Sequence, residues 1–200
     1  MSIRSVLVDF GNVIAFFDHR QACRQLAALS SDQIGADEIY AAIFETPFEA
    51  DYDTGRVSTR QFLDALRSTV RSDATDAELG QAWSDIYAPN AAMAVTLERL
   101  KTRGLRLVLA SNTNELHHQW FSRVFADTLS VFDAQVLSYR VGSRKPDRAF
   151  FEACLAAAAC PASVCLYVDD RADFVATGGA LGLQTLVYSP GVDVETATCY

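Results

Sequence analysis

One short segment near the start of the chain, Ser5-Val6-Leu7-Val8-Asp9-Phe10-Gly11, constrains the fold more than any other. The four residues before Asp9 are almost wholly apolar and favour β structure, as expected of a strand buried on both faces. A carboxylate and a glycine follow where such a strand should end. Because ligands of open parallel sheets bind outside the carboxyl ends of the strands, the segment predicts a functional carboxylate at the edge of a sheet.

Polar residues recur at the ends of later predicted strands. These strands are expected at Leu105–Ala110, Ala134–Ser138, Val164–Val168 and Gln184–Tyr188, with helical patterns between them. Ser111-Asn112 follows the first of them, a loop carrying Lys145 the second, and Asp169-Asp170 the third. Alternating strands and helices connect through right-handed crossovers into a parallel sheet covered on both faces. We therefore predict an α/β fold with a doubly wound parallel sheet.

A long helical insertion follows the first strand. Helical spacing of apolar residues dominates residues 17–89, and capping boxes at Ser58 and Thr75 mark the starts of two of its helices. The predicted organisation is an α/β core of residues 1–16 and 90–200 with an all-helical cap of residues 17–89.

Composition limits the partners. The net charge of -8 argues against nucleic acid and anionic membranes, which bind mainly through Lys and Arg. The sequence offers neither a charged leader with an apolar centre nor a run of about 18 apolar residues, so we expect a cytoplasmic protein. The five cysteines lack CxxC spacing and are expected to be buried thiols. The oligomeric state is not predicted.

The residues at the strand ends suit phosphoryl chemistry. Carboxylates that face one another repel unless a cation lies between them, and oxygen ligands without His or Cys favour Mg²⁺. A lysine and a hydroxyl directed at the same point favour a phosphoryl group. Asp9 or Ser111 alone would be interpreted as a helix cap and Lys145 alone as a surface charge. Their recurrence at successive strand ends favours a site.

These segments resemble the four motifs of the haloacid dehalogenase superfamily of aspartate-nucleophile phosphatases. The matching segments are Asp9-Phe10-Gly11-Asn12-Val13, Ser111-Asn112-Thr113-Asn114, Arg144-Lys145-Pro146 and Asp169-Asp170. The resemblance implies a nucleophilic, Mg²⁺-binding Asp9 and a phosphoryl group held by Ser111, Asn112 and Lys145. It also implies that Asp170 binds Mg²⁺ directly and Asp169 through water. The main chain of Gly11 would contact both the ion and the phosphate.

The resemblance implies a Rossmann-like core with a helical cap, and it also implies a function. The chain is expected to be a Mg²⁺-dependent phosphatase that hydrolyses a small phosphorylated metabolite, a sugar phosphate, through an aspartyl-phosphate. It resembles in particular the branch that holds the α-D-glucose-1-phosphate phosphatases. Two other classes stay open: a metal-free haloacid dehalogenase, and a catalytically weak regulatory module that binds phosphate.

Two positions depart from the family pattern. Gly11 stands where relatives carry a second Asp that protonates the leaving group, a contribution of about 10²- to 10⁴-fold. Phe174 stands where many relatives carry Asn or Asp beside the metal-binding carboxylates. Asp18 and His19 are the first alternatives for a proton donor.

Cap segments near the first motif and near Gly55 are expected to hold the substrate, because loops of this kind set specificity. The predicted pocket residues are Phe17, Asp18, His19 and Tyr52, and the same two segments offer Phe16, Asp53 and Arg56 as further candidates for substrate contact. His117 and His118 are neighbours on a predicted helix and are expected to have surface or packing roles.

Overall fold

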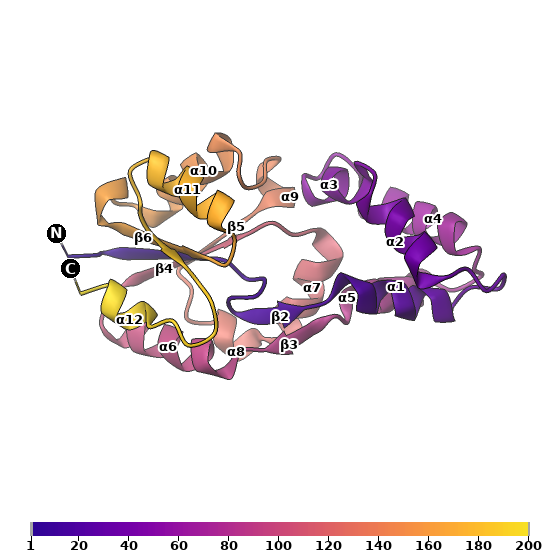
Figure 1. The fold of residues 1–200 in the computed structure, drawn as a ribbon, viewed down its shortest axis with the longest axis horizontal. Coiled ribbons are helices and arrows are strands. Elements are labelled where there is room, and N and C mark those ends of the chain that lie inside the picture. Colours follow the sequence, from indigo (N-terminus) through magenta and orange to yellow (C-terminus); the bar gives the residue numbers. More distant parts are fainter. Residues whose placement is uncertain (1, 200) are drawn as a thin grey trace.

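A five-stranded parallel sheet forms the core of the computed structural model, which describes residues 2–199 (Figure 1). The strand order is β5-β4-β1-β6-β7, so β1 (Ser5–Val8) lies at the centre, between β4 and β6. The other strands are β4 (Arg106–Ser111), β5 (Ala134–Leu137), β6 (Cys165–Asp169) and β7 (Gln184–Val187). The sheet confirms the predicted α/β class and the positions of the predicted strands to within about one residue at each end.

Helices cover both faces of this sheet (Figure 1). One face carries α10 (Arg148–Ala158) and α11 (Ala172–Ala180). The other carries α6 (Ala91–Thr102), α8 (Ala126–Leu129) and α12 (Val194–Ala197). Shorter connecting elements are α9 (Ser138–Val141) and the 3₁₀ turn η1 (Ala162–Val164), and α7 (Glu115–Val124) follows β4.

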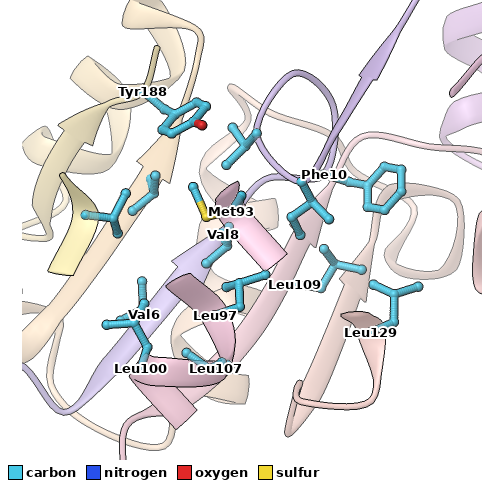
Figure 2. Packing of buried hydrophobic residues seen from close by; sticks show 14 of the residues in the cluster. Val6, Val8, Phe10, Met93, Leu97, Leu100, Leu107, Leu109, Leu129 and Tyr188 are labelled. Atoms are coloured by element: carbon cyan, nitrogen blue, oxygen red, sulfur yellow. The ribbon is translucent and has the colours of Figure 1, made fainter. Parts of the chain in front are cut away.

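Alternate residues of β1 pack on opposite faces of the sheet. Val6 and Val8 belong to the apolar cluster that includes Met93 and Leu97 of α6 (Figure 2). Leu7 belongs to the cluster on the α10 face. Because a strand alternates its side chains between two faces, a central strand with helices on both sides needs an unbroken apolar run. This explains why residues 5–8 are buried throughout.

Five helices form a separate unit beyond one end of the sheet (Figure 1). They are α1 (His19–Ala28), α2 (Ala36–Phe44), α3 (Phe48–Asp53), α4 (Thr59–Val70) and α5 (Asp76–Ser84). The unit has its own apolar cluster, with Leu26, Phe62, Leu66 and Trp83 fully buried in it. The capping boxes expected at Ser58 and Thr75 are present at the starts of α4 and α5.

The insertion begins and ends in strand rather than in helix. β2 (Ala15–Phe17) pairs antiparallel with β3 (Tyr87–Pro89), so the chain leaves the core and returns to it through one two-stranded ribbon. Phe17 and residues 87–89 were expected within an all-helical segment, but strands of three residues are too short to show a period in sequence. Within residues 2–199, every helix is too short or too polar to span a bilayer.

Candidate active site

A cavity of about 170 Å³ lies where the carboxyl ends of β1, β4 and β6 meet the helical unit. Most of the predicted site residues line it: Asp9, Gly11, Phe17, His19, Ser111, Asn112, Lys145 and Asp170. Asp169 is fully buried behind this surface. The parallel register explains the convergence, since Val8 pairs with Leu109 on one side and with Val168 on the other. The residues that follow β1 and β6, and Ser111 at the end of β4, therefore come together.

Lys145 is the buried centre of the site. Its Nζ donates to Asp9 Oδ1 at 2.6 Å, to Asp169 Oδ2 at 2.7 Å and to the Ala110 carbonyl at 2.9 Å. Burial alone would lower the pKa of Lys145, but the charges of Asp9 and Asp169 outweigh it, and the pKa is raised. An ammonium has three donors, and all three are engaged. A phosphoryl group that contacts Lys145 would therefore have to displace one of these partners.

The side chain of Asn112 holds the Lys145 loop in place. Its Nδ2 donates to the Lys145 carbonyl at 3.0 Å, and its Oδ1 accepts from the Lys145 main-chain N–H at 2.7 Å. The amide oxygen and one of the two Nδ2 hydrogens are thus engaged by the Lys145 main chain, so a phosphate contact from Asn112 would come from its main chain or from the second Nδ2 hydrogen. Ser111 is buried at the cavity wall, and its hydroxyl lies 3.4 Å from the Asn112 carbonyl oxygen.

Three carboxylates come together beside Lys145. Asp9, Asp169 and Asp170 each offer an oxygen, and these atoms lie within 4.8 Å of one another. Burial raises the pKa of Asp9 to about 7 despite the opposing charge of Lys145, and the charges of Asp169 and Asp170 add to the rise. Asn12 Nδ2 donates to Asp170 Oδ2 at 3.0 Å. One ammonium does not balance three carboxylates, so the oxygen-only donor set fits a hard divalent cation such as Mg²⁺.

Gly11 is packed against an aromatic ring. A Cβ at this position would lie 2.6 Å from Phe17 Cε1, closer than any real contact of this kind. The backbone of Gly11 is outside the left-handed region, whereas the next residue, Asn12, has φ of 56°. Phe17 on β2 therefore occupies the space that a side chain at position 11 would need.

Phe174 also lines the cavity, near two cations. Its ring centroid lies 5.5 Å from Lys145 Nζ and 4.2 Å from Arg171 Cζ. Asp173 points away and pairs with Arg171 at 2.7 Å in solvent. An aromatic ring thus stands at position 174, where the family resemblance implied Asn or Asp in many relatives.

Two predicted pocket residues do not line the cavity. Asp18 is the N-cap of α1, where it accepts from the Arg20 N–H, and it pairs with Arg24 at 2.8 Å. Tyr52 is buried inside the helical unit, stacked on Phe62, and its hydroxyl accepts from the Leu116 N–H at 3.2 Å. Successive helical residues point about 100° apart, which directs Asp53 rather than Tyr52 to the cavity.

Asp53, a candidate beside Gly55, does line the cavity, as do four residues that were not predicted as site residues: Glu49, Tyr87, His117 and Arg144. His117 does pack as expected, since its ring stacks on Trp83 with centroids 4.9 Å apart, but it also faces the cavity. Its Nε2 lies 3.2 Å from the Trp83 carbonyl oxygen, and burial lowers its pKa to about 3. His118 is half-buried and lies outside the cavity.

A family model described as "haloacid dehalogenase-like hydrolase" matches residues 3–182. The chain belongs to this family. Its fold matches that of the HAD family enzyme BT-2542 from Bacteroides thetaiotaomicron, with a TM-score of 0.84 at 20% identity over 98% of both chains. A structure of that enzyme in complex with magnesium and inorganic phosphate matches with a TM-score of 0.81, over 97% of this chain and 98% of that one.

Other haloacid dehalogenase-like proteins share the fold. A predicted hydrolase from Porphyromonas gingivalis matches with a TM-score of 0.82 at 23% identity, over 98% of this chain and 96% of that one. L-2-haloacid dehalogenase from Xanthobacter autotrophicus matches with a TM-score of 0.63 at 15% identity, over 92% of this chain and 76% of that one. A curated relative, drimenol cyclase drtB from Aspergillus calidoustus, is 23% identical over 197 residues, which are 96% of this chain and 35% of that protein. The chain thus spans about a third of this relative's length.

Proposed function

We propose that this haloacid dehalogenase-like hydrolase is a Mg²⁺-dependent phosphatase acting on a small phosphorylated metabolite, a sugar phosphate. The observation that carries the proposal is the contact of Lys145 Nζ with Asp9 and Asp169 beside Asp170, in the wall of a cavity that Ser111 also lines. The magnesium and inorganic phosphate in the similar BT-2542 structure support it. The net charge of -8 supports a small-molecule partner over nucleic acid, and the proposed location is the cytoplasm.

In the proposed reaction, Asp9 attacks phosphorus and the bond to the leaving oxygen breaks, which leaves an aspartyl-phosphate that water hydrolyses. Lys145 fixes Asp9 Oδ1, while Oδ2 receives no hydrogen bond from residues 2–199 and is the proposed nucleophilic atom. Asp9, Asp170 and the Gly11 carbonyl would hold Mg²⁺, with Asp169 close behind, and the ion would offset the charge of the phosphoryl oxygens. Ser111 and the Asn112 main chain would bind those oxygens.

The predicted proton donors are poorly suited to protonate the leaving group. Gly11 has no acid, and Asp18 lies outside the cavity. His19 lines the cavity, but burial lowers the pKa of its imidazole, so it is a poor proton donor at neutral pH. Aryl and anomeric phosphates should therefore react faster than alkyl phosphates, because their leaving groups depart with less help from a proton.

The test measures phosphate release from p-nitrophenyl phosphate with Mg²⁺ or with EDTA. We expect turnover only with Mg²⁺, and a loss of at least about 10³-fold in Asp9→Asn with the fold intact by circular dichroism. Asp173→Asn, an exposed carboxylate four residues after Asp169, is the matched control and should keep its rate. Metal-independent halide release from a 2-haloacid would instead indicate a dehalogenase, and phosphate binding without turnover a binding module.

A further inference from the structure

The cavity also contains a second group of charged side chains, which comes from the helical unit and from the loop that carries Lys145. α3 contributes Glu49 and Asp53, and the loop after α9 contributes Arg144. Arg144 Nη1 lies 3.2 Å from Glu49 Oε2 and 3.7 Å from Asp53 Oδ2. The side chains are 5% exposed for Asp53, 17% for Glu49 and 29% for Arg144, so the group is largely shielded from solvent.

The core fixes the position of this group. Asn114, the N-cap of α7, donates from Nδ2 to Asp53 Oδ1 at 3.0 Å. Gly55, two residues after α3, lies against α9: a Cβ at Gly55 would be 2.6 Å from the Tyr139 carbonyl oxygen. The Tyr52 hydroxyl bonds to the main chain of α7 from the other side of α3. α3 is therefore held on the core at several points, and its two carboxylates cannot easily leave the cavity.

The one cation of the group, Arg144, is paired within the group. Burial raises the pKa of Asp53 well above its usual value, and the charge of Glu49 adds to this, against the lowering effects of Arg144 and Asn114. The carboxylates of Glu49 and Asp53 both lie beside the one guanidinium of Arg144. Arg144 is then unavailable to an anionic leaving group, which would also meet the Glu49 carboxylate.

The hydrogen-bonding capacity of the group is not exhausted. Carboxyl oxygens accept and a guanidinium offers five N–H donors, so hydroxyl groups of a ligand would find both kinds of partner. Thr113, which lines the same cavity, has a buried Oγ1 with no hydrogen-bond partner among residues 2–199. A neutral ligand with several hydroxyls would match this end of the cavity.

We infer that Glu49, Asp53 and Arg144 bind the leaving group and select an uncharged, hydroxylated one, a short polyol or sugar, over a carboxylated one. The inference rests on the proposed phosphatase function and adds which residues bind the leaving group and which charge they disfavour in it. A site that hydrogen-bonds hydroxyls strongly disfavours an analogue that leaves its buried polar groups unpaired.

The test compares two esters with the same three-carbon skeleton, glycerol 3-phosphate and 3-phosphoglycerate, which differ in a hydroxymethyl or carboxylate end. We expect wild type to prefer glycerol 3-phosphate at least tenfold in kcat/KM. Glu49→Gln/Asp53→Asn releases Arg144 from its carboxylates and should shift the ratio of the two kcat/KM values at least tenfold toward 3-phosphoglycerate. Asp51→Asn is the matched control: Asp51 is also on α3 but pairs with Arg56 outside the cavity, so the ratio should not change.

Hydrolysis of p-nitrophenyl phosphate separates the possible failures. If wild type releases phosphate from none of the esters with Mg²⁺, the phosphatase proposal fails and the inference with it. If p-nitrophenyl phosphate is hydrolysed but 3-phosphoglycerate is used as well as glycerol 3-phosphate, only the inference fails. An unchanged ratio in the double variant also overturns it. Should the double variant not fold, Glu49→Gln alone carries the same comparison.

Discussion

Gly11 and Phe17 pack so closely that a side chain at position 11 and the ring of Phe17 would need the same space. The φ angle of Gly11 is outside the left-handed region, so its backbone accepts a side chain, but the Phe17 ring lies 2.6 Å from the place of a Cβ. Restoring a carboxylate at position 11 therefore requires that the ring move or be removed.

We predict that Gly11→Asp/Phe17→Ala gains an acid that neither Gly11→Asp nor Phe17→Ala supplies. Relative to Phe17→Ala, kcat/KM for alkyl phosphates should rise by about 10²-fold, and its dependence on leaving-group pKa should become flatter. The measurement is kcat/KM across a series of aryl and alkyl phosphates in all three variants, with Gly11→Ala as a size control. Equal gains in Gly11→Asp alone would show that Phe17 does not restrict the position.

Single residues were predictable from the sequence where the backbone direction is set by a strand. Asp9, Ser111 and Asp170 lie at or just after strand ends, and parallel strands bring such positions to one edge. The side of α3 that faces the cavity was not predictable, because this six-residue helix follows Pro47 and gives too few residues to show a period. The sequence therefore offered Tyr52, Asp53 and Arg56 together, and of these only Asp53 lines the cavity.

Two of the elements, β2 and β3, were not predicted as strands, and the reason differs from that for α3. Each has three residues, and each is stabilised by a partner about seventy positions away, so neither shows a local pattern. The longer helices α4 and α5 carry capping boxes and amphipathic spacing, and their starts were predicted within one residue.

The contact of α3 with α9 can be tested at a glycine in the turn that follows α3. Gly55 has φ of +69° and Gly104 has φ of +80°, so alanine at either site costs about 1 kcal/mol in backbone strain. Only at Gly55 would the new Cβ meet a main-chain atom, the Tyr139 carbonyl oxygen at 2.6 Å, whereas at Gly104 nothing lies within 4 Å. We expect Gly55→Ala to lose at least about 1 kcal/mol more than Gly104→Ala in urea unfolding, and to raise KM. Equal losses would mean that α3 is not seated on α9 through this turn.

For the whole molecule, His117 gives a pH dependence of stability. Its pKa is about 3 in the folded chain and about 6.5 when unfolded, so below pH 6.5 the unfolded state takes up a proton that the folded state does not. The neutral, buried imidazole therefore adds its full contribution to the free energy of unfolding above pH 6.5. As the pH falls below 6.5, this contribution decreases by up to about 1.4 kcal/mol per pH unit. His117→Gln keeps a donor for the Trp83 carbonyl but has no imidazole to protonate, so its free energy of unfolding should decrease less as the pH falls.

The measurement is urea unfolding of wild type and His117→Gln from pH 7.5 to pH 5, without added metal. The stability advantage of wild type over the variant should narrow as the pH falls. His118→Gln serves as the comparison at the neighbouring, half-buried position, where the expected change is smaller. Parallel curves for wild type and His117→Gln would contradict the buried neutral state of the imidazole.

The central place of β1 has a consequence for how the protein is made. Ser5 pairs with Arg106 on one side and Cys165 on the other, so β1 leaves the ribosome long before either neighbour has been synthesised. The five helices of residues 19–84 have mainly local contacts and their own apolar cluster, so they can form during this interval. Until its neighbours are made, the apolar side chains of β1 have no sheet in which to be buried. Of the strands of this sheet, β1 therefore waits longest for burial and most needs protection from aggregation.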